Sequence, residues 1–240
     1  MTKRHGQSYG QAIIFLGAPG SGKGTQAARL SAELGIPAVS TGEMLRRECQ
    51  SGSELGKTVQ SILASGQLVG DELINRAVAS RLSEPDCASG FILDGYPRTV
   101  AQARFLDSLL RGSRAPRPIV FHFEIAHDEV VARITHRLTC KECGRIYSAP
   151  DGTADMRCDG DGSLLVRRAD DNEVSVRERL RLYGANAAPL VRYYRSGKYH
   201  KVAAHRTAEE ITDELLGVLV PAPVAMPVHR PVPAAAAAYA

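Results

Sequence analysis

Short, continuous apolar runs alternate along this chain with longer segments in which apolar residues recur every three or four positions. Runs of this length, without polar alternation, are typical of strands buried on both faces of a sheet. They occupy residues 12–17, 37–40, 90–95, 118–125 and 199–204. Because helical segments separate them, the pattern predicts a parallel sheet covered by helices on both sides.

The helical segments are recognised by their periodicity and by their end signals. Gly35 followed by Pro37 is a stop signal after the first of them, and Asp71 is a candidate N-cap for a later one. The predicted helices cover residues 23–34, 43–50, 54–65, 71–84, 99–111, 127–137, 173–196 and 207–219.

Two regions interrupt the alternation of strands and helices. Residues 41–70 are helical without a strand, and residues 138–171 are rich in Cys, Gly, Asp and Arg with little apolar periodicity. Ligands of open α/β sheets bind at the carboxyl ends of the strands. The first region begins just past a strand end, and the second is reached from one through a single helix, so we expect both to be inserts that cover a ligand site.

Composition and charge restrict the functional class. The 240 residues are 44% hydrophobic and 23% charged, which suits one large domain or one domain with insertions. A net charge of only +4 implies no general nucleic-acid surface. No apolar stretch reaches the roughly 18 residues that a membrane span needs.

The two ends of the sequence carry little chemistry. MTKRHGQSYGQ at the start lacks the apolar region of a secretory signal, which points to the cytoplasm and argues against reading the five cysteines as disulfides. Residues 221–240 are rich in Pro and Ala, and we interpret them as a flexible tail. A docking role for this tail is the alternative.

GAPGSGKGT at residues 17–25 fits the phosphate-loop pattern G-x-x-x-x-G-K between a strand and a helix. Its glycines let several backbone N–H groups converge on one anion, and the following helix adds its positive end. Lys23 can reach the outer phosphates of a nucleotide. A glycine-rich turn without a ligand is the alternative. The candidate nucleotide residues are Gly20, Ser21, Gly22, Lys23, Gly24 and Thr25.

The hydroxyl that usually binds magnesium is absent from its place in this loop. Gly24 follows the lysine where Ser or Thr is usual, so the hydroxyl is displaced to Thr25 or missing. Mg²⁺ would then be held by phosphates, water and a carboxylate. Asp94, at the end of the run GFILD, is the candidate, with a turn-forming role before Gly95 as the alternative.

A cysteine-rich segment has the spacing of a metal site. Two pairs, each with two residues between its members, are separated by fourteen residues. This spacing is typical of tetrahedral zinc, and four protein ligands leave no position for a reactive water, so the zinc would be structural. Metal-free thiols or an iron–sulfur cluster are the alternatives. The candidate ligands are Cys140, Cys143, Cys158 and Asp161, and Asp159 fits the spacing less well.

Three motifs together identify a family. GAPGSGKGTQA, STGEMLR at residues 40–46, and DGYPRT followed by Gln102 closely resemble the adenylate kinase family of nucleoside monophosphate kinases. The resemblance runs from about residue 12 to residue 219. It implies reversible, Mg-dependent phosphoryl transfer, ATP + AMP = 2 ADP, which maintains adenine nucleotide balance. It further implies ATP, AMP and ADP as ligands, no nucleic-acid or membrane partner, and a cytoplasmic monomer.

The resemblance also implies a fold and a division of the chain. The fold class is α/β, a P-loop three-layer fold with a parallel five-stranded sheet, a helical AMP-binding insert and a small zinc-binding lid. The expected parts are an N-terminal extension (1–11), the kinase domain (12–220) with its core (12–40, 71–137 and 172–220), its insert (41–70) and its lid (138–171), and the tail (221–240).

Residue roles follow from the resemblance position by position. Beside the phosphate loop, ATP would contact Arg133, Arg137 and Tyr147. AMP would contact Thr41, Arg46, Leu68, Val69, Gly95, Arg98, Gln102, Arg168 and Arg179. The catalytic set would be Lys23, Asp94, Arg98, Arg137, Arg168 and Arg179. Asp170 and Asp171 would orient the lid arginines, with capping of the next helix as an alternative or additional role.

The predicted arginines indicate a phosphate site only when they are considered together. Arg133 and Arg137 are four residues apart and share a helical face. A guanidinium group binds two phosphate oxygens at once and stays charged. Several of them aimed at one point would repel one another without an anion, so we expect them to surround phosphates.

The sequence departs from the family in two places, and other functions remain open. The lid is shorter than usual and lacks the Asn-Pro-Pro segment, and KVAAHRT replaces the common Val-Asp-Gly before the last helix. Another acceptor such as UMP or CMP, or GTP as donor, is one alternative. A zinc-stabilised nucleotide-binding module without turnover is another, and a partner-dependent NTPase is a third.

Overall fold

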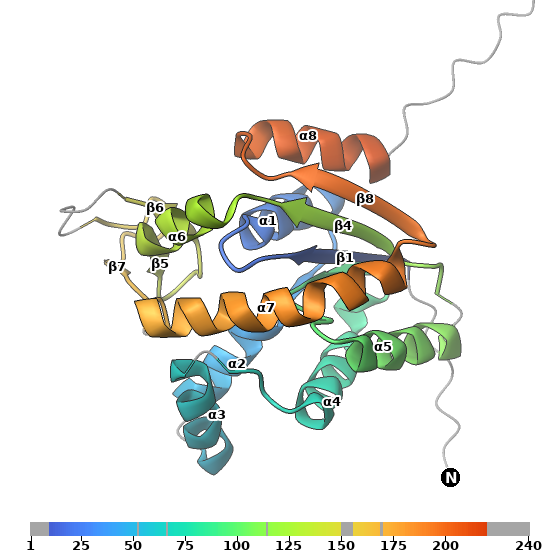
Figure 1. The fold of residues 1–240 in the computed structure, drawn as a ribbon, viewed down its shortest axis with the longest axis horizontal. Coiled ribbons are helices and arrows are strands. Elements are labelled where there is room, and N and C mark those ends of the chain that lie inside the picture. The colour runs from blue at the N-terminus through green and yellow to red at the C-terminus, as the bar shows by residue number, and fades with distance from the viewer. Residues whose placement is uncertain are drawn as a thin grey trace, which may run out of the picture.

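The computed structural model describes residues 10–219 except 52, 66, 114, 150–155 and 169, so the extension before residue 10 and the Pro/Ala tail lie outside the described residues. Its centre is a five-stranded parallel sheet with the strand order β2-β3-β1-β4-β8. Figure 1 shows β1, β4 and β8 side by side. The strands are β1 (Gln11–Gly17), β2 (Ala38–Ser40), β3 (Gly90–Asp94), β4 (Ile119–Glu124) and β8 (Lys198–Ala203). All five predicted strands and the parallel sheet are confirmed.

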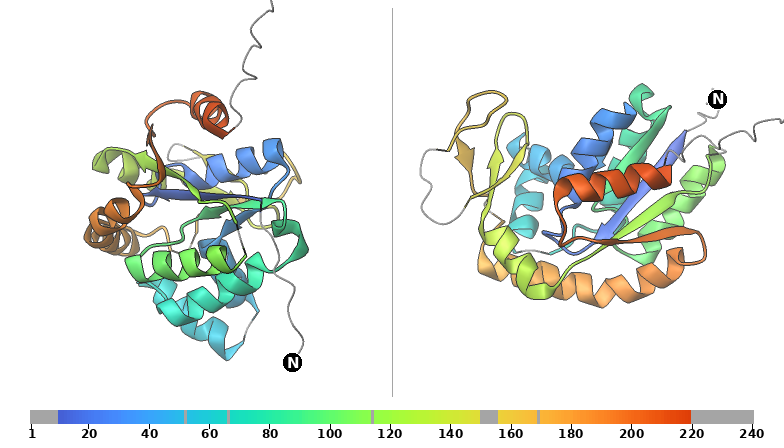
Figure 2. Two further views of the ribbon diagram at one scale, coloured as in Figure 1. Left: turned by 90° about the vertical axis from the view of Figure 1, so that its right-hand side faces the viewer. Right: turned by 90° about the horizontal axis from the view of Figure 1, so that it is seen from above.

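Helices cover both faces of the sheet (Figure 2). One face carries α1 (Lys23–Leu34) and α8 (Ala208–Leu219). The other face carries α4 (Asp71–Leu82), α5 (Val100–Gly112) and α7 (Glu173–Tyr194).

The central strand β1 shows why both faces must be covered. Its side chains alternate between the two layers: Ile13 and Phe15 join the core under α1 and α8, whereas Ile14 and Leu16 join the core under α4, α5 and α7. These four side chains are at most 5% exposed. The continuous apolar run in the sequence is therefore the signature of a strand with two buried faces.

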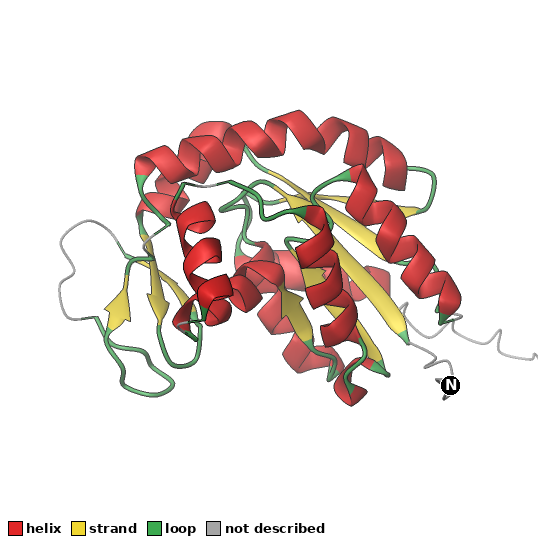
Figure 3. Ribbon diagram, turned by 90° about the horizontal axis from the view of Figure 1, so that it is seen from below, coloured by secondary structure: helices red, strands yellow, loops and turns green. Residues whose placement is uncertain are grey.

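The two predicted inserts lie beyond the carboxyl ends of the strands (Figure 3). The first consists of α2 (Thr41–Gln50) and α3 (Glu54–Ala64), which pack on each other. The second follows α6 (His127–Thr135) and contains a three-stranded antiparallel sheet in the order β6-β5-β7, which we call the small sheet. Its strands are β5 (Arg137–Cys140), β6 (Ile146–Ser148) and β7 (Leu165–Val166).

The eight predicted helices are confirmed, with ends that differ from the predicted ones by at most two residues. A short 3-10 helix, η1 (Pro85–Cys87), and the strands of the small sheet were not predicted. The strands of the small sheet are two to four residues long and partly polar, which leaves too few positions for a period-two pattern. Among the described residues, no helix combines the length and apolar character needed to span a membrane.

Candidate active site

A cavity of about 880 Å³ lies at the carboxyl ends of β1 and β3. The phosphate loop, the first insert, the small sheet and α7 all contribute to its wall. This is the edge of the sheet where parallel α/β folds bind ligands. The cavity therefore brings together the segments that the sequence motifs identified.

The phosphate loop has the backbone conformation that its glycines predict. Gly20 and Gly22 have φ angles of +79° and +89°, in the left-handed region that other residues rarely adopt. Helix α1 begins directly after Gly22, so its free N–H groups and positive end face the loop. Such an arrangement binds phosphate without needing a side chain.

Lys23 lies against its own loop. Its Nζ donates hydrogen bonds to the carbonyl oxygens of Gly17 and Ala18, at 2.9 and 2.7 Å, and to Ser21 Oγ at 3.2 Å. The pKa of Lys23 is lowered to about 8, mainly by burial; the Asp94 carboxylate opposes this shift, and the charges of Arg98 and Arg137 add to it. The oxygen atoms of a bound phosphate would replace these three neutral acceptors and would place a negative charge beside the Lys23 ammonium group.

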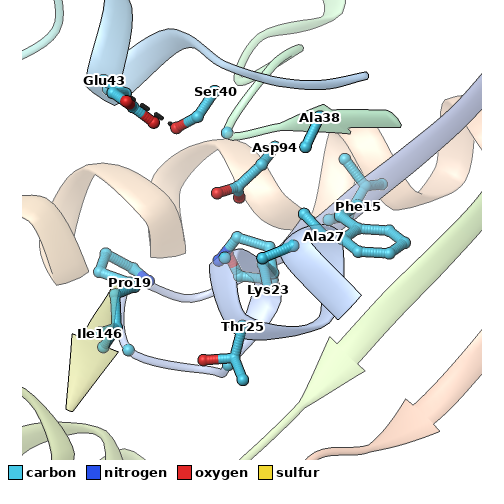
Figure 4. A pocket seen from close by; sticks show the side chains of 18 of the residues that line it. Phe15, Pro19, Lys23, Thr25, Ala27, Ala38, Ser40, Glu43, Asp94 and Ile146 are labelled. Carbon is cyan, nitrogen blue, oxygen red and sulfur yellow. Dashed lines mark hydrogen bonds between the residues drawn. The ribbon is translucent and has the colours of Figure 1, made fainter. Parts of the chain in front are cut away.

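Asp94 ends β3 opposite the phosphate loop, and its carboxylate points toward Lys23 (Figure 4). Within the described part of the chain, this carboxylate makes no hydrogen bond or ion pair. A Cβ added to Gly24 would lie 3.4 Å from Asp94 Oδ2 and 3.3 Å from Cδ1 of Ile146. Gly24 thus leaves a narrow space beside Asp94, and the carboxylate is free to bind a cation's water shell.

Six predicted arginines line this one cavity, although they come from different elements. They are Arg46, Arg98, Arg133, Arg137, Arg168 and Arg179. Arg133 also forms an ion pair with Glu129, at 2.6 Å, within α6. The expectation that the arginines converge is therefore met by the geometry.

Burial and mutual repulsion both affect the pKa values of these arginines. Burial lowers the pKa of Arg46 and of Arg98. Burial, followed by repulsion from Arg46 and Arg137, lowers the pKa of Arg168 to about 10. These guanidinium groups disfavour one another at such close quarters. A polyanion in the cavity would reverse this cost.

Asp171 ties two of the arginines together. Its carboxylate accepts from Arg137 Nε at 2.8 Å and from Arg179 Nη2 at 3.1 Å, and its side chain is 2% exposed. Asp170 pairs with Arg179 at 3.2 Å. Burial alone would raise the pKa of Asp171, but the hydrogen bonds and charges of the two arginines hold it below its usual value. The pair Asp170 and Asp171 thus positions arginines, as the family resemblance implied.

The Asp171 network should make stability depend on pH. Asp171→Asn is expected to lower the free energy of unfolding at pH 7 by about 3 kcal/mol, because two buried cations lose a partner. The depressed folded pKa means that the wild type gains this stability above the ordinary value of about 3.9 and loses it as pH falls through the folded pKa.

The difference between wild type and Asp171→Asn should therefore shrink below about pH 4 in urea unfolding experiments. Asp213→Asn, at an exposed position on α8, is the matched control and should change little at any pH. A gap that stays constant from pH 7 to pH 3 would contradict this account of Asp171.

The residues predicted for AMP fall into two groups. Arg46, Leu68, Gly95, Arg98, Arg168 and Arg179 line the cavity. Thr41, Val69 and Gln102 are at most 6% exposed and do not line it. Ser21 of the phosphate loop is also fully buried, behind Lys23.

Two of the buried residues of this set, Thr41 and Gln102, form hydrogen bonds with residues that line the cavity. Thr41 Oγ1 donates to the carbonyl oxygen of Gly95 at 3.0 Å. This carbonyl oxygen of Gly95 also accepts from Arg98 Nε at 2.7 Å. Gln102 Oε1 accepts from the Arg98 backbone N–H at 2.7 Å, while its Nε2 donates to Asp71 Oδ1 at 2.7 Å. In this structure Gln102 therefore orients the Arg98 loop, and its predicted contact with adenine stays a prediction.

The predicted zinc ligands lie close together: Cys140 ends β5 of the small sheet, and Cys143, Cys158 and Asp161 lie in the connections between its strands. One potential ligand atom from each of the four residues lies within 4.8 Å of the others, and Cys143 Sγ and Cys158 Sγ are 3.5 Å apart. Two thiolates on one tetrahedral zinc lie about 3.8 Å apart, so the donor set fits this metal. Asp159 points elsewhere, to Arg145 and Tyr147. Cys140, Cys143, Cys158 and Asp161 are thus the residues that could hold a metal.

Backbone hydrogen bonds to sulfur support the same interpretation. The N–H groups of Cys143 and Gly160 donate to Cys140 Sγ and Cys158 Sγ, both at 3.4 Å. Donors of this kind stabilise thiolate ligands and are usual around metal sites.

Sequence reasoning missed His122, whose side chain is buried in β4 and lines the cavity. Its Nδ1 lies 2.7 Å from the Tyr199 hydroxyl and its Nε2 lies 3.0 Å from the Tyr183 hydroxyl. Burial lowers its pKa, which favours the neutral ring between two hydroxyls. His122 and Glu124 are the two polar residues inside the apolar run 118–125, and a polar ring between two phenylalanines was the signal that could have identified His122.

Comparison with known proteins gives a consistent result. A family model described as "Adenylate kinase" matches residues 15–199. An adenylate kinase of Thermosipho melanesiensis is 45% identical over 210 residues, covering 86% of this chain and 98% of the relative. An adenylate kinase of Archaeoglobus fulgidus is 45% identical over 211 residues (86% and 97%), and one of Anaeromyxobacter dehalogenans strain 2CP-1 is 46% identical over 211 residues (85% and 99%).

Proposed function

The chain belongs to the adenylate kinase family, and from this premise we propose that it catalyses reversible phosphoryl transfer, ATP + AMP = 2 ADP. The observation that supports this function most directly is the single cavity in which the phosphate loop faces six arginines. One nucleotide would be served by the loop, its lysine and the two arginines expected to contact ATP, Arg133 and Arg137. The four further arginines of the cavity suit a second phosphorylated substrate; they are Arg46, Arg98, Arg168 and Arg179.

We assign the two substrates to opposite ends of the cavity. ATP would lie along the phosphate loop, with its phosphates on Lys23 and the N-terminus of α1. AMP would lie under the helical insert 41–70, with its phosphate between Arg46 and Arg98. The small sheet, within the proposed lid 138–171, would close over both, since Ile146 already lies near Gly24.

The chemistry asked of the protein is charge neutralisation and positioning. Lys23, Arg137 and Arg168 would stabilise the charge that spreads over the transferred phosphoryl group. The acceptor is an anionic phosphate oxygen, so no strong general base is required. Closure of the lid would exclude water, which could otherwise accept the phosphoryl group. Asp94 would hold the water shell of Mg²⁺, which supplies further positive charge to the phosphates.

A coupled assay with ATP, AMP and Mg²⁺ tests this function directly. ADP should form only when both nucleotides are present. No ADP in that mixture would overturn the assignment and leave the non-catalytic nucleotide-binding module in its place. Replacing AMP by UMP or CMP, and ATP by GTP, tests the alternative acceptors and donor. We expect AMP and ATP to be preferred, because the acceptor-side motifs STGEMLR and DGYPRT are those of the family.

We further propose that Cys140, Cys143, Cys158 and Asp161 bind one structural Zn²⁺. The short strands of the small sheet bury few apolar side chains, so metal binding would supply much of its folding free energy. The cytoplasmic location and the monomeric state stay predictions.

Loss of one cysteine ligand should be readily measured. Cys143→Ala is expected to weaken zinc retention by at least about 100-fold, which exceeds the usual effect of losing an outer contact. It should also lower the Tm. The measurement is metal content after dialysis against a chelator, together with thermal unfolding.

Cys49→Ala is the matched control, because Cys49 lies on α2 outside the cluster. It should retain one zinc per chain. Equal zinc content in both variants would contradict the proposed ligand set.

A further inference from the structure

The wall of the nucleotide cavity and the proposed metal site share residues. Cys143, Tyr147 and Asp159 all line the cavity. Cys143 is also one of the four cluster residues. The proposed metal site therefore forms part of the wall of the nucleotide cavity, in addition to stabilising the small sheet.

Tyr147 makes the direct connection between the two. It lies on β6, where its backbone pairs with Leu138 of β5. Its hydroxyl lies 3.3 Å from Cys158 Sγ and accepts the Asp159 backbone N–H at 3.2 Å. The same hydroxyl also contacts Asp159 Oδ1. One face of this side chain thus meets the nucleotide cavity while its hydroxyl meets a cluster sulfur.

The hydroxyl has one proton and two possible acceptors. A phenol donates a single hydrogen, so it can bond fully either to Cys158 Sγ or to Asp159 Oδ1. A thiol sulfur is a weak acceptor, whereas a metal-bound thiolate is a charged one. Metal binding, which requires the thiolate, therefore favours the bond from Tyr147 to Cys158.

Asp159, the other possible acceptor of the Tyr147 hydroxyl, is also bonded to a further residue of the cavity wall. Asp159 Oδ1 also accepts from Arg145 Nη1, at 2.7 Å, and Arg145 lines the cavity. When the tyrosine hydroxyl donates to Cys158, Asp159 keeps Arg145 as its partner. One hydrogen-bonded group thus joins three wall residues, Arg145, Tyr147 and Asp159, to a sulfur of the cluster.

From this arrangement we infer that Tyr147 is a positioning residue that couples metal occupancy of the cluster to nucleotide binding. The inference rests on the proposed function, since it needs a nucleotide in the cavity and a metal on the cluster. Metal binding orders the wall, so a nucleotide that contacts the ordered wall binds more tightly. Coupling is reciprocal, so the nucleotide must also stabilise the bound metal.

The size of the coupling is measured by nucleotide titration of metal-loaded and metal-free protein. With Mg²⁺ in excess, the metal-loaded wild type should bind ATP about three- to tenfold more tightly than the metal-free form. In Tyr147→Phe, which keeps the ring and loses only the hydroxyl, the two forms should differ less than about twofold. Tyr193→Phe is the control, because Tyr193 bonds to Asp107 away from the cavity, and it should keep the wild-type ratio.

Cadmium gives a readout that does not depend on activity. In protein loaded with ¹¹³Cd, the metal resonance should shift when ATP is added to the wild type, since the hydrogen bond to a ligand sulfur changes. The resonance of Tyr147→Phe should shift clearly less, because the ligand Cys143 still lines the cavity but the hydrogen bond to Cys158 is lost. Shifts of equal size in both proteins, or a nucleotide affinity ratio that Tyr147→Phe leaves unchanged, would overturn the inference.

The outcomes separate the inference from the proposed function. Bound cadmium and normal ADP formation, with nucleotide affinity independent of the metal, would remove the coupling alone. Failure of the chain to bind any metal would remove both the zinc assignment and the coupling, while the coupled assay would still decide the phosphotransfer activity.

Discussion

Lys23→Met is expected to lower the rate of ADP formation from ATP and AMP by about 10²- to 10³-fold, the usual cost of removing one group that stabilises transition-state charge. Methionine keeps most of the length of the side chain and loses its charge. In the structure, Lys23 is the lysine of the phosphate loop, held beside the opening of α1 by three oxygen atoms. Those acceptors are neutral, so phosphate oxygens can replace them without leaving a charge unpaired.

Steady-state kinetics at saturating ATP and AMP measure this effect. The loss should fall mainly on kcat, because the lysine neutralises charge that grows during transfer. Lys198→Met, at an exposed position at the start of β8, is the matched control and should keep full activity. Thermal unfolding of both variants separates a chemical loss from a folding defect. An active Lys23→Met protein would refute the role given to the phosphate loop.

Arg137→Lys is expected to reduce kcat by about 10²- to 10³-fold although the positive charge is kept. Arg137 lies at the start of β5 with its side chain 12% exposed, and Asp171 holds its guanidinium group in place. Only a planar guanidinium can bind Asp171 on one edge and a phosphate oxygen on another. Lysine offers a point charge on a flexible stem and would satisfy one of these partners at a time.

The control for this substitution is Arg177→Lys on the exposed side of α7. Its side chain is 77% exposed and pairs with Glu173 of the same helix. We expect its activity to match the wild type. If Arg137→Lys also retained full kcat, charge alone would suffice at this position, and the geometric part of the argument would be wrong.

The local elements of the fold were predictable because short-range patterns decide them. The apolar run 12–17 has no polar face, so it had to be a strand buried between two layers. The glycines of the phosphate loop indicated a backbone that curls around an anion, and Gly20 and Gly22 adopt the left-handed conformation that such a curl uses. Each of these features depends on residues within a few positions of one another.

The small sheet could not be predicted in the same way. Its strands are two to four residues long, and their pairing joins Thr139 to Val166 across a long connection. Cysteine spacing predicted which four residues cluster and could hold a metal, because the spacing within each pair is a short-range property. It carried no information on the contact between Tyr147 and Cys158, which depends on how the two halves of the cluster fold together.

The same distinction holds for the site. The sequence alone determined the fold class, the order of the main elements, the phosphate loop and which arginines and cysteines to examine, since these depend on residue type and spacing. Only the tertiary structure decided that Gln102 braces the Arg98 loop through Asp71, that Asp171 joins Arg137 to Arg179, and that His122 faces the cavity. These contacts join residues far apart in the chain, and no periodic pattern encodes them, because chain topology alone determines which distant side chains meet.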